Sequence, residues 1–228
     1  MKACYFCGDK KASKDHIPPK QIFKGFKINR MTVYSCNKHN SGKGHKDEAI
    51  VKSMLMAIKN SNSITITPEL SKALDEVKDH YNQVKNIVSE EQIFIDRDEN
   101  IVCLDASIDL DNWIRQLSAG MIYYKTRYYD NENDFVTSKV SERNSYSRNK
   151  RSFKDFQNER NEKIELQTMI ETGEWNSSWI PNDCYPENLY FFQYQINDDS
   201  ILIKHVFYKC FVYYNLIKIS KKTKELLS

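Results

Sequence analysis

Two short pairs of metal-ligating residues near the N-terminus constrain the fold of this chain more than any other feature. Cys4 and Cys7 are separated by two residues, and Cys36 and His39 repeat that spacing further along. Each short loop lets two ligands reach one ion, and three thiolates with one imidazole complete a tetrahedral zinc shell. A closed shell cannot activate water, so we expect a structural zinc that stabilises a module too small for its own apolar core. His45 is the alternative to His39 as the fourth ligand.

The region that holds these ligands is strongly basic. Residues 1–60 contain 13 Lys and Arg residues against 4 Asp and Glu residues, although the chain of 228 residues has a formal net charge of only +3. A basic surface on a compact metal module favours a polyanionic partner such as nucleic acid. No apolar run approaches the roughly 20 residues that cross a bilayer, and the N-terminus lacks the apolar core of a signal peptide. We therefore expect a cytoplasmic protein that does not associate with membranes.

The hydrophobic pattern predicts an α+β fold in two parts. Residues 1–60 form the zinc module, in which 31–36 is a strand that enters the second ligand pair and 47–59 is a helix with acids at its start. Residues 61–228 form an accessory α+β domain whose role stays open. In this second part the pattern predicts a helix that begins at Thr67-Pro68, two strands in 92–104, a helix over 109–126 and antiparallel strands over 188–219.

The residues around the second ligand pair extend the zinc pattern into a longer motif. Asp15-His16 stands between the two pairs and is followed by Ile-Pro-Pro, Asn40 follows the second pair directly, and acids come seven and eight residues after Asn40. This order resembles the HNH endonucleases, whose ββα-metal fold is often supported by a zinc held between two such pairs. The resemblance covers residues 4 to about 58. It implies an N-terminal zinc-stabilised ββα-metal module followed by a mixed domain of helices and antiparallel strands.

The resemblance implies a role for the histidine and the asparagine of the motif. In the family the histidine after the acid deprotonates the attacking water, so the role of general base falls on His16. Histidine suits this role because its pKa lies near the working pH. The family's asparagine helps to hold the imidazole in one orientation, and Asn40 occupies that position.

The resemblance also implies a catalytic Mg²⁺ or Mn²⁺. Asp15 would be one ligand, because these hard ions prefer oxygen. The other ligand is expected at the start of the following helix, where many relatives carry a histidine. Glu48 is preferred because its distance from Asn40 matches the subgroup that carries an acid, Asp47 is second and His45 is third.

The activity implied by the resemblance is hydrolysis of phosphodiester bonds in DNA, which would leave a 5′-phosphate and a 3′-hydroxyl. Lys14, Lys20, Lys43 and Lys46 are expected to contact phosphates. RNA stays an alternative substrate, and phage defence or a mobile element is a setting that the resemblance permits. Because each chain has one site, cleavage of both strands favours a homodimer or two successive nicks, and an activating partner protein is the alternative to a homodimer.

A second hypothesis comes from a different functional class. The chain could be a non-catalytic zinc module that binds nucleic acid or a protein. This hypothesis explains the cysteines and the basic charge. It does not explain why Asp15, His16 and Asn40 stand at the spacing of the nuclease motif.

Overall fold

The computed structural model describes residues 3–10, 12–29, 31–40, 43–60, 66–78, 93–96, 101–104, 110–129, 169–170, 172–179, 184–209 and 211–228. Its α+β composition with antiparallel strands confirms the predicted fold class at that level. Within the described residues, no helix combines the length and the apolar character that crossing a membrane requires.

The N-terminal region is a β-hairpin followed by helices. Strand β1 (Ala12–His16) pairs antiparallel with β2 (Thr32–Cys36), which places His16 opposite Thr32. The short 3-10 helix η1 (Lys20–Phe23) lies between the strands, and α1 (Asn37–Asn40) and α2 (Lys43–Asn60) follow them. The predicted strand is confirmed, but the helix predicted at 47–59 begins one turn earlier and has no acid in its first turn. The apolar periodicity starts only at Ile50 and therefore gave no signal for this extra turn.

The predicted elements of the middle region are confirmed. Helix α3 (Pro68–Lys78) begins at the expected proline, and the hydroxyl of Thr67 accepts a hydrogen bond from the backbone N–H of Leu70 at 3.2 Å. This side-chain cap satisfies one of the free donors at the helix start. Strands β3 (Ile93–Asp96) and β4 (Ile101–Leu104) form an antiparallel hairpin, and α5 (Leu110–Thr126) follows.

The C-terminal region is a four-stranded antiparallel sheet. Its strand order is β5 (Asn176–Ser177), β6 (Tyr190–Ile196), β7 (Ser200–Phe207) and β8 (Phe211–Lys218). The predicted strands at 188–219 correspond to β6, β7 and β8. Two elements of this region were not predicted. Strand β5 is too short for a periodic signal, and α7 (Lys221–Leu227) depends on an N-cap in which the Ser220 hydroxyl accepts from the N–H of Thr223.

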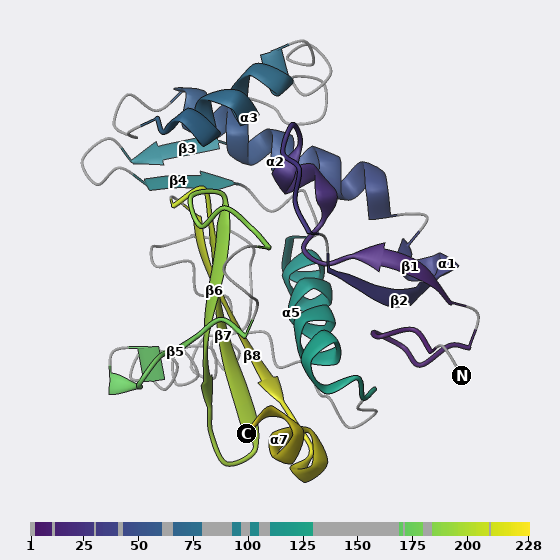
Figure 1. Ribbon diagram of the computed structural model, residues 1–228. Helices are drawn as coiled ribbons and strands as arrows, with labels where there is room; N and C mark the ends of the chain where they lie inside the picture. Colours follow the sequence, from purple (N-terminus) through teal and green to yellow (C-terminus); the bar gives the residue numbers. More distant parts are fainter. Residues whose placement is uncertain are drawn as a thin grey trace, which may run out of the picture.

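Helix α5 lies between the N-terminal hairpin and the C-terminal sheet (Figure 1). It contacts β2 on one side and β8 on the other. One cluster of buried apolar side chains includes Ile17 after β1, Ile50 of α2, Leu117 of α5 and Phe207 of β7. The two parts predicted from the sequence therefore share a hydrophobic core, and α5 connects them.

Candidate functional site

Four side chains converge at one end of the hairpin, as the sequence predicts. The ligand atoms of Cys4, Cys7, Cys36 and His39 all lie within 4.8 Å of one another. The Sγ atoms of Cys7 and Cys36 are 3.7 Å apart, and Nδ1 of His39 lies 3.2 Å from the sulfur of Cys36 and 3.7 Å from that of Cys4. His39 is thus the fourth member of the cluster, and the alternative His45 is an exposed residue of α2.

The local sequence explains how the four ligands are held. The N–H of Gly8 donates to the carbonyl of Cys4 at 2.9 Å, and the φ of +73° at Gly8 closes the first turn in a conformation that favours glycine. The N–H of Tyr5 donates to the carbonyl of Tyr34, which ties this turn to β2. The ring of Phe6 packs edge-on against the imidazole of His39, with 4.9 Å between the ring centres. The two residues between the cysteines therefore have structural roles of their own.

The donor set fits a tetrahedral zinc ion. Zinc–sulfur bonds of about 2.3 Å place two sulfurs of a tetrahedron about 3.8 Å apart, close to the 3.7 Å between Cys7 and Cys36. Burial, Lys38 and Lys43 together lower the pKa of His39, which keeps the imidazole neutral as a ligand must be. Burial is the main factor that raises the pKa of Cys7 to about 11. Metal binding at this thiol would therefore release a proton. The cluster could hold a metal such as zinc.

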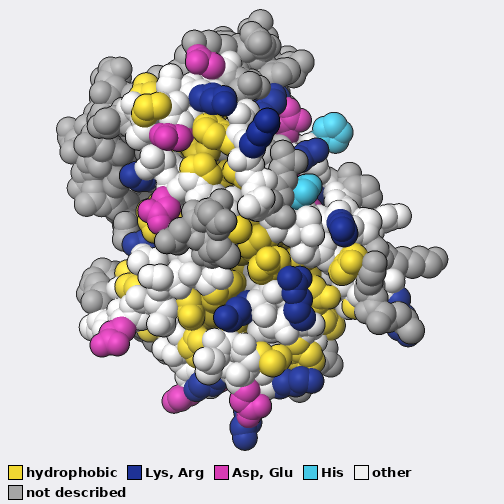
Figure 2. All heavy atoms as spheres, in the orientation of Figure 1, with side chains coloured by type: hydrophobic (Ala, Val, Ile, Leu, Met, Phe, Trp, Pro, Cys, Tyr) yellow, Lys and Arg dark blue, Asp and Glu magenta, His cyan; other side chains and the backbone are white. Residues whose placement is uncertain are grey.

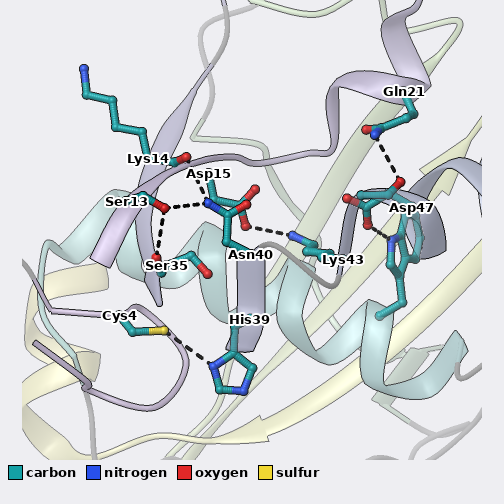
Figure 3. Close-up of polar contacts among 12 residues, drawn as sticks. Cys4, Ser13, Lys14, Asp15, Gln21, Ser35, His39, Asn40, Lys43 and Asp47 are labelled. Atoms are coloured by element: carbon teal, nitrogen blue, oxygen red, sulfur yellow. Dashed lines mark hydrogen bonds and ion pairs between the residues drawn. The ribbon is translucent and has the colours of Figure 1, made fainter. Parts of the chain in front are cut away.

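A buried ion pair lies beside the metal cluster. The Nζ atom of Lys43 is 3.1 Å from Oδ2 of Asp15, and the two side chains are 7% and 10% exposed (Figure 3). Burial on its own would lower the pKa of Lys43, but the nearby Tyr5, Asp15 and Asp47 raise it above the ordinary value. These neighbours therefore favour the charged form of Lys43. This residue was expected on the surface as a phosphate contact, and the structure places it inside.

Asp47 lies close to this ion pair. Its Oδ1 accepts a hydrogen bond of 2.7 Å from the indole N–H of Trp113 on α5. Burial raises the pKa of Asp47 to about 6, although Lys43 and the Trp113 hydrogen bond act in the opposite direction. The negative charge of Asp15 also contributes to this rise, so the two carboxyl groups interact through space.

The other two candidates for the second catalytic ligand differ from Asp47 in burial. The carboxylate of Glu48 forms an ion pair of 2.7 Å with Lys52, one turn further along α2, and its side chain is 43% exposed. His45 is exposed. Of the three residues, Asp47 is the buried one. Among the described residues, the zinc-type cluster is the one group of three or more ligating side chains, so Asp15 does not belong to a second such group.

Asn40 is the last residue of α1, and His16 is the last residue of β1. The side-chain amide of Asn40 donates to the hydroxyl of Ser13 at 2.8 Å and to the carbonyl of Lys14 at 3.3 Å (Figure 3). Asn40 therefore holds β1 directly before Asp15-His16. His16 is half-buried at the last position of β1.

The C-terminal region contributes a contact next to His16 that the sequence did not indicate. The hydroxyl of Tyr185 donates to the carbonyl of Ile17 at 2.9 Å and accepts from the N–H of Met31 at 3.0 Å. This tyrosine thus bridges the residue that follows β1 and the residue that precedes β2, at the end of the hairpin opposite the metal cluster. No local pattern reveals this role or that of Lys43, because both depend on residues distant in the sequence. The hydrogen bond from Trp113 to Asp47 likewise had no sequence signal.

No family model, no curated protein and no solved structure matches this chain. The geometry of the site is therefore the basis for any statement about function.

Proposed function

We propose that the protein is a metal-dependent endonuclease of the HNH type that hydrolyses phosphodiester bonds in DNA. The observation that carries the proposal is the position of Asn40. Its amide holds the strand carrying Asp15-His16, while the first turns of α2 bring Asp47 into electrostatic contact with Asp15. Zinc in the cysteine and histidine cluster would fix the hairpin relative to α1, because Cys36 and His39 lie on those two elements.

In the proposed reaction His16 acts as the general base. The oxygen of a water molecule forms a bond to phosphorus, the bond from phosphorus to the 3′-oxygen breaks, the proton of the attacking water passes to the imidazole, and the leaving 3′-oxygen takes a proton from a second water molecule. The products are a 5′-phosphate and a 3′-hydroxyl. A divalent cation bound by Asp15 and Asp47 would neutralise negative charge on the phosphate and on the leaving oxygen. We place Asp47 before Glu48 as the second ligand because Glu48 forms its ion pair with Lys52.

The ion pair between Lys43 and Asp15 favours a second candidate function. The ammonium already neutralises one of the two carboxylates at which a divalent cation would bind. If it stays in place, the protein is a zinc-stabilised module that binds nucleic acid or a protein without cutting. The two functions differ in their metal content, because the binding module holds one zinc ion and does not respond to Mg²⁺ or Mn²⁺.

Cleavage of supercoiled plasmid tests the proposal. Purified protein is incubated with plasmid in the presence of Mg²⁺, Mn²⁺ or EDTA, and the zinc content of each sample is measured beside its activity. We expect wild-type protein to nick the plasmid with Mg²⁺ or Mn²⁺. His16→Ala should lose at least a hundredfold in rate while its zinc content and melting temperature stay close to wild type.

Two further variants identify the second carboxylate. Asp47→Asn should be inactive, whereas Asp75→Asn, the same change at an exposed position of α3, should cut like wild type. Loss of nicking in Glu48→Gln but not in Asp47→Asn would make Glu48 the ligand. If wild-type protein leaves plasmid, single-stranded DNA and RNA intact with zinc bound, the non-catalytic module replaces the nuclease.

A further inference from the structure

A pocket opens where the hairpin meets the C-terminal end of α5. Its volume is about 330 Å³. The residues that line it come from β1, from β2 and its preceding residue, and from the end of α5 and the turn after it: Lys14, Met31, Thr32, Val33, Tyr34, Tyr124 and Arg127. It thus combines two cationic and two tyrosine side chains.

The chemistry of the lining is that of a site for a nucleotide. Lys14 and Arg127 are exposed, and Tyr34 and Tyr124 are half-buried. Cationic side chains beside aromatic rings are the combination with which proteins hold single-stranded nucleic acid, because the cations contact phosphates and bases stack on the rings. Figure 2 shows hydrophobic side chains, with tyrosine among them, interspersed with Lys and Arg side chains over α5.

Arg127 is held in position by the backbone and by Tyr124. Its φ is +55°, a conformation that glycine usually adopts at the end of a helix. Its N–H donates to the carbonyl of Tyr123 at 2.7 Å, which ends α5, and its guanidinium carbon lies 4.3 Å from the centre of the Tyr124 ring. A guanidinium stacked in this way keeps its edge available for hydrogen bonds to a phosphate.

The pocket borders the part of β2 that pairs with Asp15-His16. Val33, the cross-strand partner of Asp15, lines it together with Lys14 of β1. The cross-strand partners of Lys14 and His16 are Tyr34 and Thr32, which both line the pocket. In Figure 3 the side chain of Lys14 extends away from the pair formed by Asp15 and Lys43.

We propose that this pocket binds one unpaired nucleotide of the substrate strand, next to the phosphate on which His16 acts. Its phosphate would lie between Lys14 and Arg127, and its base or sugar would pack against Tyr34 and Tyr124. This proposal rests on the proposed nuclease function and makes it more specific. A base inside a duplex is already stacked and cannot reach the tyrosines. The protein therefore selects single-stranded or locally opened DNA.

Fluorescence anisotropy of a labelled 12-nucleotide oligo-dT strand tests the proposal, with no divalent cation added, so that cleavage does not interfere. The main variant is Arg127→Gly, because glycine suits the positive φ and the protein should stay folded. Its matched control is Lys209→Gly, which removes one positive charge at another residue with positive φ (+58°). Lys209 is at the other end of α5 from the pocket. It lies two residues after Phe207, whose ring packs on Trp113 in the first turn of α5, whereas the pocket is lined by residues at the last turn.

Arg127→Gly and Lys14→Ala are each expected to raise the dissociation constant about tenfold, and Lys209→Gly less than twofold. Each of the first two should also reduce the slope of log K against log salt concentration by about 0.7, the value for one phosphate contact on a single strand. Tyr124→Leu should weaken binding at an unchanged salt slope. Wild-type protein should bind the same strand in a duplex at least tenfold more weakly.

The proposal is overturned if wild-type protein does not bind the strand, if it binds the duplex equally well, or if the pocket variants bind like Lys209→Gly. The plasmid assay separates this result from a failure of the nuclease function. Nicking that requires His16, combined with unchanged binding in the pocket variants, refutes the pocket alone. Loss of binding in those variants, combined with no cleavage of any substrate, leaves a binding site in a protein that does not cut.

Discussion

At the residue scale, the buried lysine of the site is the largest departure from the expected arrangement. Lys43 was expected to contact phosphate, yet its ammonium lies between the carboxylates of Asp15 and Asp47 and near the Tyr5 hydroxyl. An ammonium in this place neutralises negative charge as a divalent cation would. In the proposed function the cation would therefore have to compete with Lys43 for Asp15.

Replacing Lys43 by Met should lower the free energy of unfolding by about 3 kcal/mol, because it leaves a buried carboxylate without its partner. Added Mg²⁺ should raise the melting temperature of Lys43→Met by several degrees more than that of wild type, since the ion can then take the position of the ammonium. The control is Lys52→Met, which removes the ion pair with Glu48 on the same helix and should cost about 0.5 kcal/mol. If Mg²⁺ raised the melting temperatures of the two variants equally, the idea that the ion takes the position of the Lys43 ammonium would be wrong.

A second buried titratable residue has a structural role. His205 of β7 is fully buried, with Nε2 at 2.7 Å from the hydroxyl of Ser118 and Nδ1 at 2.9 Å from that of Tyr190. Because the Ser118 hydroxyl donates to the carbonyl of Ile114, Nε2 donates to Ser118 and Nδ1 accepts from Tyr190. Burial lowers the pKa of His205 to about 3. This neutral imidazole links α5 to the sheet.

The pKa of His205 predicts a loss of stability in acid. Between about pH 6.5 and pH 3 the unfolded histidine binds a proton that the folded one does not, so stability falls as the pH falls through this range and is constant above it. Urea unfolding at pH 4.5 to 7.5 should give a slope near 1.4 kcal/mol per pH unit from this group at the acid end. His205→Asn should lose that contribution, while His45→Asn, at an exposed position, should keep it. Identical pH profiles for wild type and His205→Asn would exclude this role.

At the scale of elements, the contact between α5 and the hairpin depends on one glycine. A Cβ atom at Gly120 would lie 2.8 Å from Cδ1 and from Cγ1 of Ile17, the residue after His16. Ile17 is fully buried and cannot move aside easily. The absence of a side chain at position 120 is therefore what allows the helix to pack directly beneath the end of β1.

Gly120→Ala should lower the free energy of unfolding by about 1 kcal/mol, because the cost of overpacking exceeds the gain in helix propensity. The shift of Ile17 should also reduce the rate of plasmid nicking, since His16 is its neighbour. Gly44→Ala is the matched control, because a Cβ there has no atom within 4 Å, and it should be neutral or slightly stabilising. Thermal unfolding of both variants measures the difference, and a stabilised Gly120→Ala would contradict the close packing.

At the scale of the whole molecule, a tyrosine of the C-terminal region connects the two ends of the segment that joins the hairpin strands. The hydroxyl of Tyr185 bridges Ile17 and Met31, and its ring stacks on Phe23 of η1 with 4.5 Å between the centres. The region beyond residue 60 thus contributes to the position of His16. Its role includes completing the site, whatever else it binds.

Tyr185→Phe should cost about 1–3 kcal/mol, because it leaves the buried N–H of Met31 without an acceptor. We expect the maximal rate of nicking to fall about tenfold with little change in the apparent substrate affinity, since the change affects the position of His16 and leaves the cationic and tyrosine side chains of the pocket unchanged. Tyr208→Phe, which removes a longer hydrogen bond of 3.4 Å to the carbonyl of Ile22, should change the rate by less than twofold. Equal rates for the two variants would show that the bridge does not position His16.

Most of the secondary structure and the metal cluster could be predicted from the sequence. The stripe of α5, the cap at Thr67 and the strands β6 to β8 have local signals of period or capping, and the structure confirms them. The first turn of α2 has no such signal. In this turn Lys43 forms its ion pair with Asp15 of β1, and this contact joins segments that are distant in the sequence.

The parts of the site differ in the same way, because some depend on local sequence and others on contacts between distant segments. Amino-acid sequence by itself determined the three cysteines of the metal cluster and favoured His39 over His45, because ligands two residues apart can reach one ion wherever the rest of the chain lies. Only the tertiary structure decided that Lys43 is buried against Asp15, that Asp47 is buried while Glu48 pairs with Lys52, and that Lys14 and Arg127 share a pocket. These outcomes depend on how α2 and α5 are rotated against the hairpin. That rotation is set by the packing of the whole core and by no local pattern.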